Sequence, residues 1–208
     1  MTSTTSSTTS ERPAEPEATR ADARRNRETV IEAALTALAA DPNASMLDIA
    51  NAAKLGRTTV YRHFDNREEL IVALFERVIR DAQLATGTVI DQRLAVDQTL
   101  RALGPVMIAI GERFRFLHAH LEIGAKALAE SKRVPDDPVR LFLLDALAAG
   151  KLRADAPLSW MLSMMQSTAM ATMDEVHAGN LDSDAAGRLL GETFVALFSA
   201  PRGRYGSR

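Results

Sequence analysis

The stretch from residue 45 to residue 70, SMLDIANAAKLGRTTVYRHFDNREEL, constrains the fold more than any other part of the chain. It holds two short amphipathic segments joined by a tight turn, and a new helix start follows at once. Ser45 is placed to cap the first segment, with Asp48 as the acid of a capping box three positions on. Gly56 is placed to cap the second segment and Asn66 the helix after it. The pattern predicts a helix-turn-helix.

The apolar residues of this stretch indicate which faces are buried. Ile49, Ala50 and Ala53 form a compact face, and alanine suits two helices that cross closely. Val60 and Phe64 lie four residues apart and point inward from the second helix. The outward-facing residues then form a basic, hydroxyl-bearing and aromatic surface: Arg57, Thr58, Tyr61 and Arg62.

The run GRTTVYRHFDNREEL resembles the DNA-binding core of TetR-type transcriptional repressors, whose second motif helix ends in Tyr-x-x-Phe. The run IANAAKLGR resembles the preceding helix and turn of the same family. The resemblance implies a homodimeric repressor that binds a palindromic operator and is released by a small ligand. The chain departs from the family at Lys54, where glycine is common, and at Gly56, where serine is usual. A left-handed backbone at Lys54 would cost roughly 1–2 kcal/mol.

The resemblance also implies roles for individual side chains. Arg57 would contact guanine O6 and N7, and Thr58 and Thr59 would meet base edges or a thymine methyl group. Ser45 and Arg67, at two helix N-termini, would hold phosphates. Tyr61 and His63 match family positions that usually bind phosphate, and Arg62 is suited to either a phosphate or a base.

The composition favours an all-α protein. The chain has 208 residues, 46% of them hydrophobic, which is enough for a substantial core. Hydrophobic periodicity is helical nearly throughout, which predicts about nine helices. The absence of cysteine excludes disulfides and thiolate metal sites, and we expect no cofactor. No apolar signal region or long apolar run is present, so we expect a cytoplasmic protein without a membrane contact.

The net charge of −2 does not by itself favour DNA binding. Between residues 20 and 67, however, eight lysines or arginines face six aspartates or glutamates, a local balance of +2. This excess is small, so the DNA-binding interpretation depends on where the charges lie on the motif. Ordinary solvated surface charge is the alternative.

The sequence suggests four parts. Residues 1–19, rich in Ser, Thr, Pro and Glu, are expected to be disordered. Residues 20–66 form the helix-turn-helix domain, and residues 67–200 a helical regulatory and dimerisation domain. Residues 201–208 are a flexible tail. The first helix has one apolar face: Val30, Ile31, Ala34, Leu35 and Leu38. The arginines ahead of it, at 20, 24, 25 and 27, either solubilise the helix or reach the DNA backbone.

The C-terminal part is a series of amphipathic helices. A helix near 91–103 meets Gly104-Pro105, which either ends it or kinks a longer one. Residues 131–136 suggest a mobile loop, and the helix over 138–149 is closed by Gly150. The last two helices, 157–177 and 183–199, are apolar on more than one face. We therefore expect them to pack on their own domain and on the same pair of a second chain, as TetR-like proteins do.

The family holds its small ligand among the middle helices, and an aromatic, methionine-rich lining suits an apolar or amphipathic compound. The candidate ligand-binding residues are Phe114, His118, Phe142, Trp160, Met164 and Gln166. The alternative is that these residues are plain core, and Trp160 also fits a dimer interface. His118 and Glu122 share a helix face but have no third ligand of suitable spacing, so we expect no metal site.

Two other functions remain open at this stage. One is a helix-turn-helix regulator controlled by a protein partner or without any ligand, whose methionine-rich region is solid core. The other is an all-helical enzyme or carrier that keeps the motif as a scaffold. The sequence contains nothing that resembles a nucleophile elbow, a phosphate loop or a paired-carboxylate site, so we do not expect an enzyme.

Overall fold

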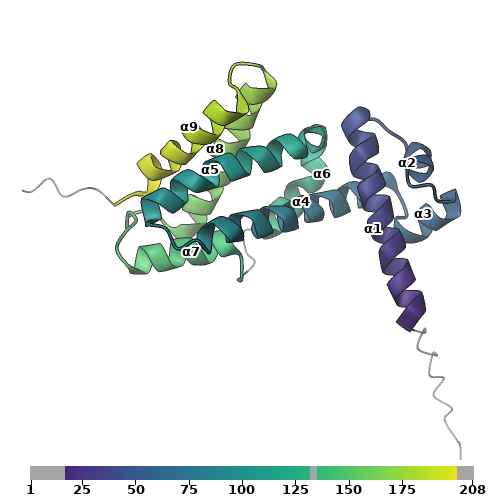
Figure 1. Cartoon of the computed structure of the whole chain (residues 1–208), viewed down its shortest axis with the longest axis horizontal. Coiled ribbons are helices and arrows are strands. Elements are labelled where there is room, and N and C mark those ends of the chain that lie inside the picture. The colour runs from purple at the N-terminus through teal and green to yellow at the C-terminus, as the bar shows by residue number, and fades with distance from the viewer. Residues whose placement is uncertain (1–16, 132–134, 201–208) are drawn as a thin grey trace, which may run out of the picture.

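The computed structural model describes residues 17–131 and 135–200, and both stretches are helical (Figure 1). The N-terminal unit consists of α1 (Glu17–Ala40), α2 (Met46–Ala52) and α3 (Arg57–His63). The long helix α4 (Arg67–Ile90) leads from it into the rest of the molecule. There follow α5 (Val96–Arg113), the short 3-10 helix η1 (Arg115–His120), α6 (Leu121–Ser131), α7 (Pro138–Ala148), α8 (Leu158–His177) and α9 (Ser183–Phe198). The all-α prediction is confirmed for the described residues.

The N-terminal helices form as their sequence predicts. The whole predicted apolar face of α1 is buried, from Val30 to Leu38. Helix α1 begins at Glu17, which lies within the segment 1–19 expected to be disordered. Residues 1–16, the tail 201–208 and part of the loop expected at 131–136 lie outside the described residues. Among the described helices, none has the length and the apolar character needed to cross a membrane.

Two apolar cores lie along α4. The first contains residues of α1, α2, α3 and the N-terminal half of α4, including Leu70 and Leu74. Three residues that follow α5 also belong to this core: Phe114, Phe116 and Leu117. The second core contains Val89 of α4 and buried residues of α5, α7, α8 and α9. Because α4 belongs to both cores, the division of the chain at residue 67 stays a prediction.

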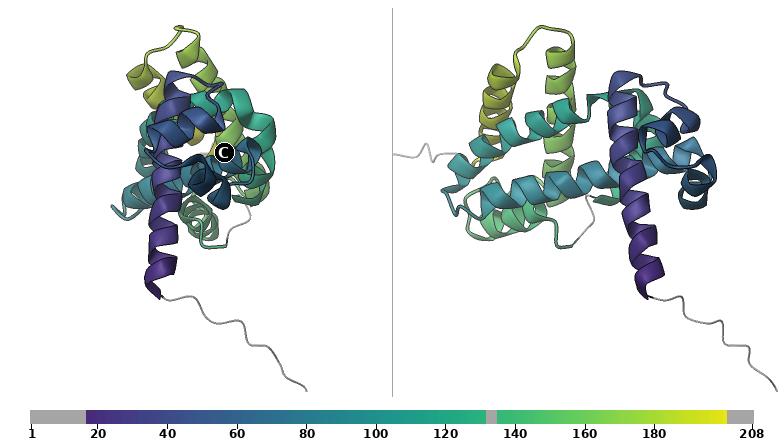
Figure 2. Two further views of the ribbon diagram at one scale, coloured as in Figure 1. Left: turned by 90° about the vertical axis from the view of Figure 1, so that its right-hand side faces the viewer. Right: turned by 45° about the vertical axis from the view of Figure 1, so that its right-hand side comes forward.

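Figure 2 shows the same arrangement from two further sides. Helices α1–α3 lie at one end of α4, and α5 lies between α4 and α9. The start of η1 follows directly on α5, at the end of the molecule where α1 crosses α4. The helical body is thereby connected to the helix-turn-helix unit at two places, through α4 and through η1.

Helix α5 continues through Gly104-Pro105, which settles the question of whether that pair ends the helix. The reason is its contact with α9. A Cβ added to Gly104 would lie 2.3 Å from the carbonyl oxygen of Gly187, and one added to Gly191 would lie 2.4 Å from that of Arg101. Pro105 has no N–H to donate to the Arg101 carbonyl, and α9 approaches that carbonyl instead. The backbones of α5 and α9 are therefore in direct contact.

This close contact makes a prediction about stability. Gly191→Ala should lower the free energy of unfolding by about 1–3 kcal/mol, because the new methyl group meets backbone atoms that cannot move aside. Urea denaturation followed by circular dichroism measures the change. Gly87→Ala is the matched control, since its Cβ would meet the Pro138 ring at an ordinary 3.5 Å. That control should gain stability, because alanine is the better helix former. Equal changes in the free energy of unfolding for the two variants would contradict the close contact between α5 and α9.

Candidate DNA-binding surface and ligand cavity

The helix-turn-helix is fixed by caps that the sequence predicts. The Ser45 hydroxyl accepts a hydrogen bond from the Asp48 N–H at 3.2 Å, and the Asp48 carboxylate accepts one from the Ser45 N–H at 2.8 Å. This capping box is confirmed. The Ser45 hydroxyl also donates to Asp48, and these bonds hold the pKa of the Asp48 carboxyl below its ordinary value. At the start of α4, the Asn66 side chain accepts from the Glu69 N–H at 2.9 Å.

The turn between α2 and α3 is closed by backbone hydrogen bonds. Leu55 donates to the Ala50 carbonyl, and Lys54 donates to the Asn51 carbonyl, both at 3.1 Å. This pair of bonds is a Schellman motif, which requires a left-handed residue at its centre. Lys54 occupies that position with φ of 55°. The turn therefore keeps its geometry although lysine replaces the favoured glycine.

Helix α3 presents one exposed polar face. Its predicted inward residues, Val60 and Phe64, are fully buried. Arg57, Thr58 and Arg62 are exposed, and Tyr61 is half-buried beside them. The guanidinium carbon of Arg57 lies 5.2 Å from the centre of the Tyr61 ring, a cation–π contact that orders the arginine.

Two of the predicted DNA-binding residues lie at the edge of this face. Thr59 and His63 are both half-buried. The Nε2 atom of His63 is buried and has no hydrogen-bond partner among the described residues. Burial lowers the pKa of His63, and the nearby charges of Arg62 and Arg27 lower it further. The imidazole is therefore neutral near pH 7, and Nε2 meets a phosphate only if the ring turns outward.

Arg67 is engaged within the protein. Its Nη2 donates to the Pro42 carbonyl at 2.7 Å and its Nε to the Ala44 carbonyl at 3.1 Å. The Nε2 atom of His120 also lies 3.2 Å from the Pro42 carbonyl oxygen. Arg67 thus ties the start of α4 to the loop between α1 and α2. The phosphate contact predicted for Arg67 must share the guanidinium with these bonds.

Arg27 has a position that the sequence did not reveal. Its guanidinium carbon lies 4.9 Å from the centre of the Phe64 ring, at the end of α3. The basic run before the first apolar face was visible in the sequence, but the contact joins residues of two different helices. It depends on how α1 crosses α3.

Two adjoining cavities of about 220 Å³ each lie where α4, α5 and α8 meet. Both are lined by Val78, Met107 and Gln166. The first is otherwise lined mainly by apolar side chains, among them Phe75, Ile110, Phe114, Leu117, Met170 and Met173, with Arg115 and His177 as polar neighbours. The second extends toward Gln83, Thr86 and Asp137. An apolar lining with a few polar groups is typical of small-molecule sites.

The structure brings two of the six predicted ligand-binding residues to these cavities, Phe114 and Gln166. Phe142 lines a separate open groove between α4 and α7. Met164 packs against the second core. Trp160 is 37% exposed and meets the Phe198 ring edge-on, with the ring centres 6.2 Å apart. The side chain of His118 lies outside the described residues.

The sequence prediction named Phe114 but missed three residues of α5 that line the first cavity with it, Met107, Ile110 and Gly111. The spacing of these four residues places them on one helix face. That signal was present in the sequence, because all four residues follow Pro105 and keep this spacing whether a helix continues through Pro105 or begins there. Within residues 17–131 and 135–200, no group of three metal-ligating side chains is placed to hold a metal ion.

Comparison with known proteins finds a family model that is similar to the N-terminal helices. Residues 30–74 match the family model described as "Bacterial regulatory proteins, tetR family". The HTH-type transcriptional repressor LfrR of Mycolicibacterium smegmatis is 31% identical over 118 residues, which is 51% of this chain. That match spans 62% of the repressor's length, less than two thirds of it.

Two solved structures share the fold over most of their length. The TetR-like regulator LfrR from Mycobacterium smegmatis, in complex with proflavine, has a TM-score of 0.63 and 23% identity, covering 83% of this chain and 96% of that chain. The SmeT–triclosan complex has a TM-score of 0.61 and 20% identity, covering 88% of this chain and 95% of that chain.

Proposed function

Because residues 30–74 match the tetR family model, we propose that the protein is a homodimeric transcriptional repressor of that family. It binds a palindromic operator and is released by a small apolar or amphipathic ligand. The observation that carries this proposal is the exposed polar face of α3, set on the buried Val60 and Phe64. A helix of this kind enters the major groove, and a dimer presents two of them to two half-sites.

The side chains divide into base contacts and phosphate contacts. Arg57 reads guanine, because its guanidinium is exposed, ordered by Tyr61 and able to donate two parallel hydrogen bonds. Thr58 and Thr59 meet neighbouring bases, Tyr61 and Arg62 contact the DNA backbone, and His63 joins them when its ring turns outward. Ser45 and Arg67 already form hydrogen bonds within the protein, so they bind DNA phosphates only with the donors that these bonds leave free. Phosphate contacts set the position on the duplex, and base contacts set the sequence.

The role of Arg57 makes the first functional prediction. Arg57→Ala should weaken binding to a selected operator by about 1–3 kcal/mol and leave binding to scrambled DNA nearly unchanged. Gel-shift titrations on both duplexes measure the two affinities. Arg80 is an exposed arginine of α4, and Arg80→Ala is the control for the loss of one positive charge. If Arg57→Ala weakens both duplexes equally, Arg57 is a phosphate contact and does not read a base.

The outer faces of α8 and α9 are suited to join two chains. Trp160 is 37% exposed on α8 and Leu189 is 52% exposed on α9. Ser167 and Ala171 on α8, and Ala196 on α9, are small exposed residues that allow helices to approach closely. The proposed dimer is a four-helix bundle built from these two helices and their symmetry mates.

The dimer model predicts that Leu189→Glu converts the protein to a monomer, because two carboxylates would be buried against apolar surface. Sedimentation equilibrium measures the molar mass. Leu84→Glu is the matched control, since Leu84 is an even more exposed leucine, at 72%, and lies on α4. A dimer that survives Leu189→Glu but dissociates with Leu84→Glu would place the interface on α4.

The cavity shared by α4, α5 and α8 is the proposed ligand site. Its aromatic rings and methionines adapt to flat apolar compounds, and Gln166 offers hydrogen bonds at its centre. The LfrR and SmeT structures were solved with proflavine and triclosan, both aromatic compounds. We infer that a ligand of this class binds among Phe114, Met107 and Gln166.

A thermal-shift assay tests this site with proflavine and triclosan as probes. A ligand at about 100 times its dissociation constant stabilises the folded state by about 2.7 kcal/mol, which raises the melting temperature. Ala169→Met fills the cavity from α8 and should abolish that rise. Trp160→Phe, away from the cavity, should keep it. A rise that survives Ala169→Met would place the ligand elsewhere, and no rise with either probe would favour a regulator controlled without such a ligand.

A further inference from the structure

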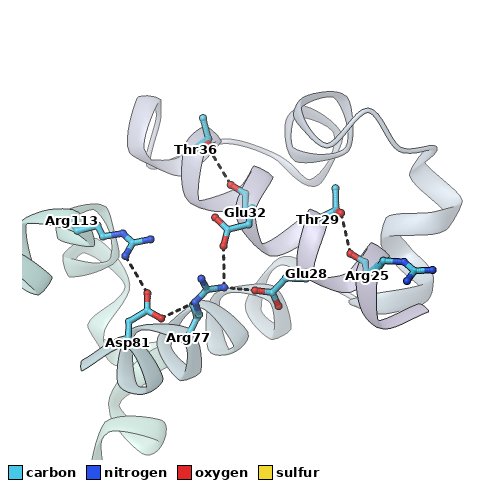
Figure 3. Close-up of polar contacts among 8 residues, drawn as sticks. All are labelled: Arg25, Glu28, Thr29, Glu32, Thr36, Arg77, Asp81 and Arg113. Carbon is cyan, nitrogen blue, oxygen red and sulfur yellow. Dashed lines mark hydrogen bonds and ion pairs between the residues drawn. The ribbon is translucent and has the colours of Figure 1, made fainter. Parts of the chain in front are cut away.

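Five charged side chains connect α1, α4 and α5, and Figure 3 shows how they meet. Arg77 of α4 is at the centre. Its Nη1 atom pairs with Glu28 and, at 3.0 Å, with Glu32, both on α1. Its Nε atom donates to Oδ1 of Asp81 at 2.9 Å. The other oxygen of Asp81 lies 3.3 Å from Nη1 of Arg113, the last residue of α5. We call these five residues the charge cluster.

The centre of the charge cluster is shielded from water. The side chains of Arg77 and Asp81 are only 20% and 17% exposed, whereas the outer members are more than half exposed. Oδ2 of Asp81 is buried and has no hydrogen-bond partner among the described residues. The ion pair with Arg113 is therefore what compensates the burial of that oxygen.

The excess of negative charge in the charge cluster is smallest when Arg113 is in place. Three carboxylates then face two guanidinium groups. Without Arg113, Asp81 and the two glutamates of α1 share the single guanidinium of Arg77, and their mutual repulsion weakens the attachment of α1 to α4. The hold on α1 therefore depends on a residue that belongs to α5.

The position of Arg113 depends in turn on residues that line the ligand cavity. Its guanidinium carbon lies 5.0 Å from the centre of the Phe114 ring, which lines the cavity. A Cβ added to Gly111 would lie 2.8 Å from the sulfur of Met173, so the end of α5 is packed tightly on α8. Phe114 also belongs to the buried core of α1–α3. A molecule that moves Phe114 therefore moves Arg113 relative to Asp81.

We propose that the charge cluster couples the ligand cavity to the orientation of the DNA-binding helices. Arg113 in contact with Asp81 holds α1 on α4, and a ligand that displaces Phe114 withdraws Arg113 and releases α1. The proposal rests on the proposed function for the ligand in the cavity and for the weaker DNA binding of the released helices, whereas the attachment of α1 through Arg113 is independent of it. The ligand shifts this equilibrium by its difference in affinity for the two arrangements.

The first experiment uses the free protein and needs no DNA. Hydrogen–deuterium exchange of the full chain is compared for the wild type, Arg113→Gln and Arg80→Gln. We expect Arg113→Gln to speed exchange in α1 by roughly threefold to fivefold, as loss of a partly shielded ion pair allows, and to leave α8 and α9 unchanged. Arg80→Gln removes an exposed charge of α4 and should change exchange in neither region. Unchanged exchange in α1 would overturn the proposal.

The second experiment is a double-mutant cycle on DNA binding. The DNA is a duplex that the wild-type protein selects from a random-sequence pool. Arg113→Gln should weaken binding by roughly threefold to fivefold. In the Asp81→Asn background Arg113 has lost its carboxylate partner in the charge cluster. Arg113→Gln should then have little further effect on the affinity for DNA.

The outcomes separate the two proposals. If Arg113→Gln lowers the affinity for DNA as much in the Asp81→Asn background as in the wild type, the charge cluster does not connect Arg113 to DNA binding. If the wild type selects no DNA at all, the proposed function fails, while the exchange experiment still decides whether Arg113 holds α1. If Arg113→Gln affects DNA binding but not exchange in α1, Arg113 acts by another route and the proposal is wrong.

Discussion

The burial of α4 in two separate cores is the constraint on which the structure depends. Leu70 and Leu74 at its start are covered by α1–α3, and Val89 near its end lies in the core of the helical body. A helix held at both ends transmits a movement of one end to the other, because closely packed interiors do not deform gradually. The helix-turn-helix unit is therefore positioned by the helical body.

The recognition surface depends on the same burial. Helix α3 has only seven residues, and a helix of that length is not stable alone in water. Val60 and Phe64 anchor it in the first core, and the Schellman motif at Lys54 sets its direction. Arg57, Thr58 and Arg62 are then presented outward at almost no further cost in conformational freedom of the backbone.

The helical body combines one very tight contact with one loose region. Glycines bring the backbones of α5 and α9 together around Pro105, and this contact fixes the path of α5. Two residues after Pro105, Met107 of the same helix lines the cavities, and Phe114, directly after the helix, lines the first of them. The contact with α9 holds α5 in the core, while a bound molecule would meet Phe114 and its neighbour Arg113 at the other end of the helix.

The sequence by itself determined the features that depend on neighbouring residues in the chain. The caps at Ser45 and Asn66, the inward positions of Val60 and Phe64, and the helix end at Gly150 all follow from local hydrogen bonding and helical spacing. Only the tertiary structure decided what depends on contacts between distant helices. Gly104-Pro105 stays helical because α9 packs on it, and Arg67 turns to the carbonyls of the loop before α2. The charge cluster forms because α1 and α5 converge on Arg77 and Asp81, and no local pattern encodes that crossing.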